Sequence, residues 1–285
     1  MWFGTGMTDT DLGKFGLWTG WAAFGPAQAR DLETLGYGSV WLGGSPPAEL
    51  PTVAELLAAT ETLRVGTSVV NIWASPAKRV AESYHALEAR FPGRFLLGVG
   101  AGHREHTSTY RKPYDALVEY LDELDEAGVP RERRALAALG PRVLRLAGER
   151  TAGALPYLTT PEHTRQARAI LGPDALLIPE QKIVLDTDPV RARRTARPRV
   201  EFYLQLTNYT ASLRRLGFTD EELAFPGTDA AIDRLVRHGD ADQVADALYE
   251  HLAAGANEVA VQVADADPIA ALRALAPALA ARTHA

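Results

Sequence analysis

Residues 63–106 constrain the fold of this chain more than any other part of its sequence. The stretch holds two apolar runs, residues 64–70 and 95–99, and the segment between them repeats apolar side chains at spacings of three and four. The runs suit strands that are covered on both faces, and the spacing predicts a helix over about residues 76–90. This order of elements predicts a right-handed βαβ unit with parallel strands.

Both predicted strands end in residues that suit a binding site. The first runs into Ser68 and Asn71, and the second into Gly98-x-Gly100-x-Gly102. Glycine lets the backbone turn sharply and lets a ligand approach closely. Because ligands bind at the carboxyl ends of parallel strands, we expect the site at this edge.

The alternation of strand and helix continues along the chain. It predicts further strands at residues 14–18, 39–42, 134–139, 154–158, 175–185 and 258–263. The total of eight strands with intervening helices is that of an α/β fold of the (β/α)8 TIM-barrel type. An open doubly wound sheet is the alternative, although it more often divides into two halves.

Two segments depart from this alternation. Residues 1–11 have no periodicity and are expected to form a flexible leader. Residues 189–239 are mostly helical in pattern with no clear strand, and they are too many for one crossover. We therefore expect one barrel domain over residues 12–285, with a helical insertion at about 189–239 between strands seven and eight.

The composition excludes several classes of protein. A net charge of −6 offers no electrostatic footprint for nucleic acid, and no apolar run approaches the ~20 residues that span a bilayer. No basic segment followed by an apolar run opens the chain, so we expect a cytoplasmic protein. The absence of cysteine removes disulfides, thiolate nucleophiles and cysteine metal sites.

Two predicted strands run directly into helices that open with proline. Gly140 precedes Pro141, and Thr159 and Thr160 precede Pro161. Neighbouring helix N-termini at one edge of a sheet offer free backbone N–H groups to an anion. Two well-capped helices without any ligand explain the same residues, so both interpretations stay open.

His103 follows the three glycines, where it suits either a general acid or base or an exposed loop position. Together with Glu105 and His106 it suggests a metal, but consecutive loop residues rarely give good ligand geometry, and we expect none. The glycine run lacks the last spacing, G-x-x-G, of the dinucleotide fingerprint G-x-G-x-x-G. A nicotinamide site is therefore a weak interpretation.

The runs G-T-S-V-V-N-I-W-A-S-P at residues 66–76 and G-R-F-L-L-G-V-G-A-G-H at 93–103 resemble the luciferase-like monooxygenase superfamily. More narrowly, they are similar to its deazaflavin-dependent oxidoreductases, which use coenzyme F420. The strand ends A-L-G-P and Y-L-T-T-P fit the same family. The resemblance implies a (β/α)8 barrel with a helical insertion, and commonly a homodimer.

The resemblance also implies the roles of particular residues. A flavin-type ring would lie on a bulge at the end of strand three, formed by Ser68 and Val69 with a cis peptide bond between them. The other implied cofactor-binding residues are Asn71 beside the bulge, Ala101, Gly102 and His103 around the ring, and Leu139, Gly140, Thr159 and Thr160 at the phosphate.

The sequence departs from the family at two places. Members often carry an acidic residue and a histidine at the end of strand two, where this chain has Gly43, Gly44 and Ser45. A family glutamate that can donate a proton after strand four corresponds to His103. The sugar-phosphate dehydrogenases of the family are therefore a poor guide to the substrate.

These observations lead to a hypothesis about function. We expect an F420-dependent oxidoreductase that transfers a hydride between the reduced cofactor and an unidentified small organic substrate, with His103 as the proton donor or acceptor. The expected walls of the substrate pocket are Trp18, Ser45, Trp73 and Tyr110. The alternatives are an FMN-dependent monooxygenase on the same barrel and a deazaflavin-binding protein without turnover.

Overall fold

The computed structural model describes residues 12–102 and 112–283. Its strands lie in one sheet in the order β10-β9-β11-β1-β2-β3-β5-β6-β7-β8, with β4 paired to β5, and every pair is parallel. The strands are β1 (Leu12–Gly20), β2 (Tyr37–Gly43), β3 (Arg64–Thr67), β4 (Val70–Asn71), β5 (Phe95–Gly100), β6 (Arg134–Leu136), β7 (Gly153–Ala154), β8 (Leu176–Leu177), β9 (Glu180–Val184), β10 (Val236–His238) and β11 (Val259–Val263). The predicted α/β class is confirmed.

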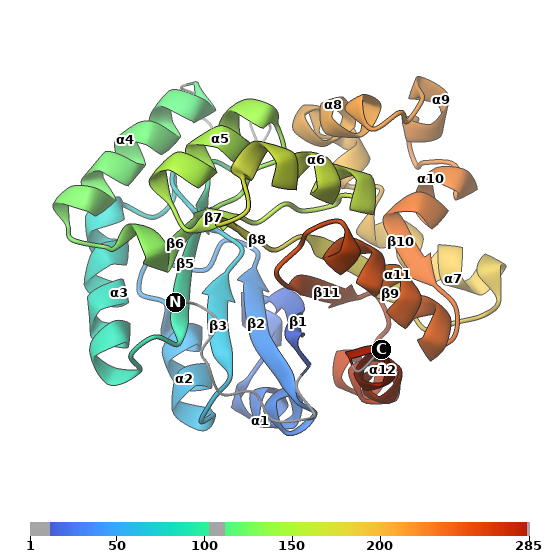
Figure 1. The fold of residues 1–285 in the computed structure, drawn as a ribbon, viewed down its shortest axis with the longest axis horizontal. Helices are drawn as coiled ribbons and strands as arrows, with labels where there is room; N and C mark the ends of the chain where they lie inside the picture. Colours follow the sequence, from blue (N-terminus) through green and yellow to red (C-terminus); the bar gives the residue numbers. More distant parts are fainter. Residues whose placement is uncertain (1–11, 103–111, 284–285) are drawn as a thin grey trace.

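One extended segment, residues 176–184, connects the two sides of this sheet. Its first part, β8, pairs with β7, and its second part, β9, pairs with β11. Hydrogen bonds continue across the junction, because Glu180 N–H donates to Pro156 O and Ala260 N–H donates to Pro179 O. The sheet therefore curls back on itself, as Figure 1 shows.

Helices cover the outside of the curled sheet (Figure 1). They are α1 (Pro26–Thr34), α2 (Pro51–Ala59), α3 (Ala77–Arg90), α4 (Pro113–Glu126), α5 (Pro141–Arg150), α6 (Pro161–Leu171), α11 (Ala241–Ala253) and α12 (Pro268–Thr283). Several of them begin with proline, whose fixed φ and missing N–H suit the first turn. Within the described ranges, no helix has the length and apolar character needed to cross a membrane.

A mainly helical segment lies between β9 and β11. It contains α7 (Pro189–Ala196), α8 (Thr207–Arg215), α9 (Asp220–Leu223) and α10 (Asp229–Leu235). The prediction of no strand in this segment was wrong, because β10 pairs with β9. Three residues are too few to show a strand period, which explains the omission. The buried side chains of this segment pack against Leu158, Val184 and Ala264, which lie at or beyond the carboxyl ends of β7, β9 and β11.

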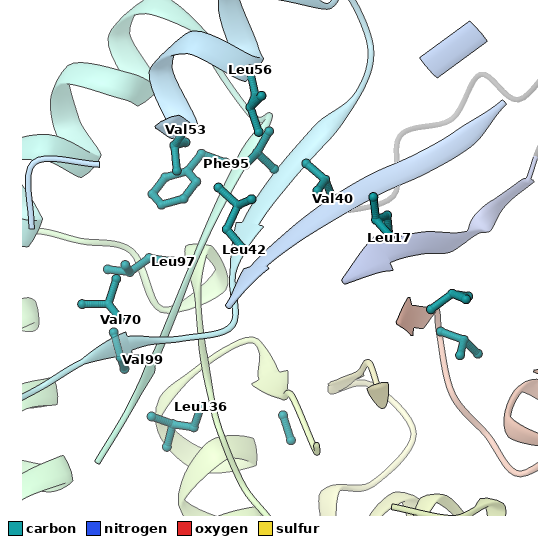
Figure 2. Packing of buried hydrophobic residues seen from close by; sticks show 14 of the residues in the cluster. Leu17, Val40, Leu42, Val53, Leu56, Val70, Phe95, Leu97, Val99 and Leu136 are labelled. Atoms are coloured by element: carbon teal, nitrogen blue, oxygen red, sulfur yellow. The ribbon is translucent and has the colours of Figure 1, made fainter. Parts of the chain in front are cut away.

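The buried apolar side chains form layers on the two faces of the sheet. Figure 2 shows the outer layer, in which Val40 and Leu42 of β2 and Phe95 and Leu97 of β5 pack with helix residues such as Val53. The alternate positions on these strands face inward and form a separate cluster: Trp41, Leu96, Ala135, Leu155, Ile178 and Ala260. This alternation follows the two-residue period of strands.

A buried carboxylate lies on the inner face, near the amino ends of the strands. Glu258, immediately before β11, is fully buried and accepts hydrogen bonds from Trp41 Nε1 at 2.6 Å and from the Ser39 hydroxyl. The Arg64 guanidinium lies 3.5 Å from its second oxygen. Groups from β2, β3 and the start of β11 are thus held together at the end of the sheet opposite to the predicted site.

Several predicted strands are shorter in the structure. The predicted strand 64–70 is divided into β3 and β4. Of the strands predicted at 134–139 and 154–158, only residues 134–136 and residue 154 lie in strands. The remaining residues form loops at the carboxyl ends, where the predicted site lies. Apolar content alone does not distinguish a buried loop from a buried strand.

Candidate functional site

The interruption between β3 and β4 forms one part of the site. The peptide bond between Ser68 and Val69 is cis, which confirms the prediction. After it, β4 pairs with β5 so that Asn71 lies opposite Gly100. A Cβ added to Gly102, whose φ is +60°, would lie 2.7 Å from Asn71 Nδ2. Asn71 and the glycine run therefore lie against each other.

Trp73 fixes this group of loops. Its backbone N–H donates to Asn71 Oδ1 at 2.9 Å, and its indole Nε1 donates to Ala101 O at 2.6 Å. The two hydrogen bonds hold the loop after β4 against the loop after β5. Trp73 is half-buried at the predicted site.

Glycines keep the inner surface at this edge of the sheet free of projecting side chains. A Cβ added to Gly100 would lie 2.7 Å from Val69 Cγ2 and 2.9 Å from Ala137 Cβ. A Cβ added to Gly43 would lie 2.0 Å from the six-membered ring of Trp18, so the indole lies directly over this glycine. The result is a surface of small residues beside a flat aromatic side chain, which suits a planar ligand.

A second part of the site lies at the N-termini of α5 and α6. Gly140 is the N-cap of α5 and has no capping side chain, whereas Thr160 caps α6 by accepting the His163 N–H at 3.4 Å. His163 Nε2 donates to Leu139 O at 2.9 Å, which joins the two helix starts. Leu139, Gly140 and Thr160 thus lie close together at the two helix starts.

Unsatisfied polar groups lie at these helix starts. The Thr159 hydroxyl and His163 Nδ1 are buried and have no hydrogen-bond partner within the described residues. Burial lowers the pKa of His163, and the nearby Arg215 guanidinium lowers it further. Arg215 on α8 also lies 3.9 Å from the position of a Cβ added to Gly140. A free hydroxyl donor, two helix N-termini and an arginine suit an anion such as a phosphate.

A third group lies where the loop after β7 meets the first part of β9, and the sequence analysis missed it. Lys182 Nζ lies 3.1 Å from both carboxylate oxygens of Glu180 and 3.9 Å from the centre of the Tyr157 ring. The Tyr157 hydroxyl donates to Gln262 Oε1 at 2.9 Å, and its ring lies 5.0 Å from Trp18. The available signal was P-E-Q-K-I-V, in which an acid and a base two residues apart share one face of a strand.

Aromatic residues of the helical segment cover this group. The Tyr203 ring lies 5.0 Å from the rings of both Tyr157 and Tyr209. Burial raises the pKa of Tyr157 and Tyr209 well above the usual tyrosine value, so both hydroxyls stay protonated. Phe202, the residue before Tyr203, differs from these buried rings, because its side chain is 44% exposed.

The remaining predicted site residues are placed differently. His103 and Tyr110 lie outside the described residues, as do Glu105 and His106. Ser45 is exposed on the loop after β2 with φ of 56°. The described ranges contain no group of three histidine or carboxylate side chains arranged to hold a metal ion.

Comparisons with known proteins agree with the motifs. The family model described as luciferase-like monooxygenase matches residues 21–134. The F420-dependent glucose-6-phosphate dehydrogenase of Microbacterium testaceum (strain StLB037) is 31% identical over 133 residues, which make up 40% of this chain and 38% of that relative. The chain thus matches less than half of the relative's length. The predicted resemblance to this superfamily is confirmed.

Solved structures share the fold over nearly the whole chain. An F420-dependent secondary alcohol dehydrogenase in complex with an F420–acetone adduct has a TM-score of 0.73 and 15% identity, covering 93% of this chain and 98% of its own. The oxygenating constituent of 3,6-diketocamphane monooxygenase from Pseudomonas putida, in complex with FMN, has a TM-score of 0.61 and 15% identity, covering 88% and 90%. These likenesses show the fold.

Proposed function

We propose that this chain, whose residues 21–134 match the luciferase-like monooxygenase family model, is an oxidoreductase that uses coenzyme F420. The observation that carries the proposal is the buried, unpartnered Thr159 hydroxyl beside the N-termini of α5 and α6. It lies at the same edge of the sheet as the glycine-lined surface. A ligand with a planar ring and an anionic side chain fits both parts, and the F420-dependent relatives support this choice.

The proposed roles follow from the three parts of the site. When bound, the deazaflavin would supply or accept the hydride, and the protein would hold and orient it. Val69, Gly100 and Ala101 would lie beneath the ring, with Ser68, Asn71 and Gly102 at its edge, while Leu139, Gly140, Thr159 and Thr160 would hold the phosphate. Trp18, Ser45, Trp73 and Tyr110 would face a small organic substrate.

The two neighbouring threonines provide a matched test of the phosphate site. Thr159→Val removes an unpartnered hydroxyl and should weaken F420 binding about tenfold while leaving the melting temperature unchanged. Thr160→Ala removes the cap of α6 and should lower the free energy of unfolding by about 1 kcal/mol. Fluorescence titration and thermal melting measure the two effects. Unchanged F420 affinity in Thr159→Val would reject the phosphate site.

His103 is the proposed proton donor or acceptor for the substrate. In the sequence, His103 follows the glycine run that ends β5, which supports this role. His103→Ala should lower turnover by ~10²-fold or more and leave F420 affinity nearly unchanged. Single-turnover kinetics with a substrate found by screening measures the first quantity. A wild-type rate in the variant would remove His103 from the reaction.

An FMN-dependent monooxygenase is the second candidate, because a structure with this fold holds FMN. Reduced F420 and reduced FMN, each oxidised in the presence of a panel of carbonyl compounds with and without oxygen, distinguish the two. An F420 enzyme consumes its reduced cofactor with substrate in the absence of oxygen. Binding of F420 without turnover on any substrate would indicate a deazaflavin-binding protein.

We also propose that residues 12–285 form one (β/α)8 barrel domain, that residues 189–239 are its helical insertion, and that the protein is a cytoplasmic homodimer. The packing of the helical segment against Leu158, Val184 and Ala264 supports the second point. Sedimentation over a range of concentrations tests the dimer, and a monomer mass throughout would reject it.

A further inference from the structure

We propose that the buried Glu180–Lys182 pair on β9 is a positioning element for the anion site, because Glu180 holds the turn that presents Thr159. The inference rests on the proposed F420 function and assigns a role to two residues without direct contact to the cofactor. The relevant contacts run from Lys182 to Glu180, from Glu180 to Leu158, and from Leu158 along the chain to Thr159.

Leu158 has an unusual backbone conformation immediately before the anion site. Its φ is +53°, which lies in the left-handed region that residues other than glycine, asparagine and aspartate rarely adopt. Its N–H donates to Glu180 Oε2 at 3.0 Å, and its side chain is 2% exposed within the cluster of the helical segment. Burial and this hydrogen bond therefore help to fix the backbone of Leu158 immediately before Thr159.

Lys182 fixes the carboxylate that accepts this bond. Both side chains are almost completely buried, and Lys182 Nζ lies at 3.1 Å from each oxygen of Glu180. The ammonium group also lies over the Tyr157 ring, 3.9 Å from its centre, which provides a second contact. A buried carboxylate without such a partner would be protonated or would turn away. The pair thus sets the position of the acceptor for Leu158.

The turn affects a ligand through Thr159. This residue follows Leu158 directly, and its hydroxyl is buried and unpartnered, whereas Thr160 is already engaged as the cap of α6. A change in the backbone at Leu158 redirects the Thr159 hydroxyl and leaves the glycine-lined surface at β3–β5 untouched. The pair should therefore influence recognition of the phosphate and not of the ring.

Two double variants isolate the hydrogen bond to Leu158. E180Q/K182M removes both charges and keeps an oxygen acceptor of the same length, whereas E180L/K182M removes both charges and the acceptor. Each is titrated with F420 and with the deazaflavin riboside that has the same ring and ribityl chain without the phosphate. We expect E180L/K182M to bind F420 about tenfold more weakly than E180Q/K182M does, and both to bind the riboside equally.

E180D gives a second comparison in case E180L/K182M does not fold. The shorter side chain keeps the charge beside Lys182 but withdraws from the Leu158 N–H, so F420 affinity should fall several-fold with riboside affinity unchanged. Equal F420 affinity in all the variants, or parallel losses for F420 and the riboside, would overturn the positioning role. If the wild-type protein binds neither ligand, the proposed function itself fails, and this result is distinct from the other two.

Discussion

Glu258→Ala is expected to lower the free energy of unfolding by about 3–5 kcal/mol, which is the usual loss when one member of a buried ionic and hydrogen-bonded group is removed. Glu258 is fully buried and accepts from the Trp41 indole and the Ser39 hydroxyl, with Arg64 beside it. The variant removes the buried acceptor that these groups share. Chemical denaturation of both proteins measures the difference.

An exposed glutamate in an ion pair provides the control. Glu49 lies 2.8 Å from Arg79, and the two side chains are 59% and 60% exposed. Surface pairs of this kind contribute little, so Glu49→Ala should unfold at the same denaturant concentration as the wild type. If Glu258→Ala also unfolded at the denaturant concentration of the wild type, the buried group around Glu258 would not hold this end of the sheet together.

Gly100→Ala is expected to weaken F420 binding by about a hundredfold, or about 2.7 kcal/mol. The added Cβ would lie 2.7 Å from Val69 Cγ2 and 2.9 Å from Ala137 Cβ, and both neighbours are short side chains that cannot bend away. Val69 or Ala137 must therefore move toward the proposed ring position. Extra volume in a packed site also destabilises the fold by about 1–3 kcal/mol.

Gly20→Ala is the matched control for this variant. Gly20 ends β1 at the same edge of the sheet, has φ of −68°, and offers open space around an added Cβ. The affinity of the Gly20→Ala variant for F420 and its melting temperature should remain those of the wild type. Equal affinities for Gly100→Ala and Gly20→Ala would show that the ring does not lie over β5.

The sequence predicted the alternation of elements well, because this alternation depends on short-range patterns. The glycine run of β5 and the Ser68–Val69 interruption lie within one βαβ unit, where the strand register follows from the order of elements. The boundaries of β6 and β7 were predicted less well, since their carboxyl-terminal residues are buried in loops and look like strand residues.

The contacts between distant strands could not be predicted from the sequence. Lys182 meets Tyr157 only because the curled sheet places β9 near the end of β7, and Tyr203 joins them from the helical segment. Similarly, the sequence alone did not distinguish the hydroxyls of Thr159 and Thr160 as candidates for the phosphate site. The structure separates them, because one caps a helix and the other has no partner within the described residues.

Equilibrium titration of the wild-type protein with oxidised F420 and, separately, with FMN tests the proposed cofactor most directly. We predict saturable binding of F420, affinity for F420 well above that for FMN, and a weaker F420 complex in Thr159→Val. No saturable binding of F420, or tighter binding of FMN, would contradict the assignment of this site to a deazaflavin.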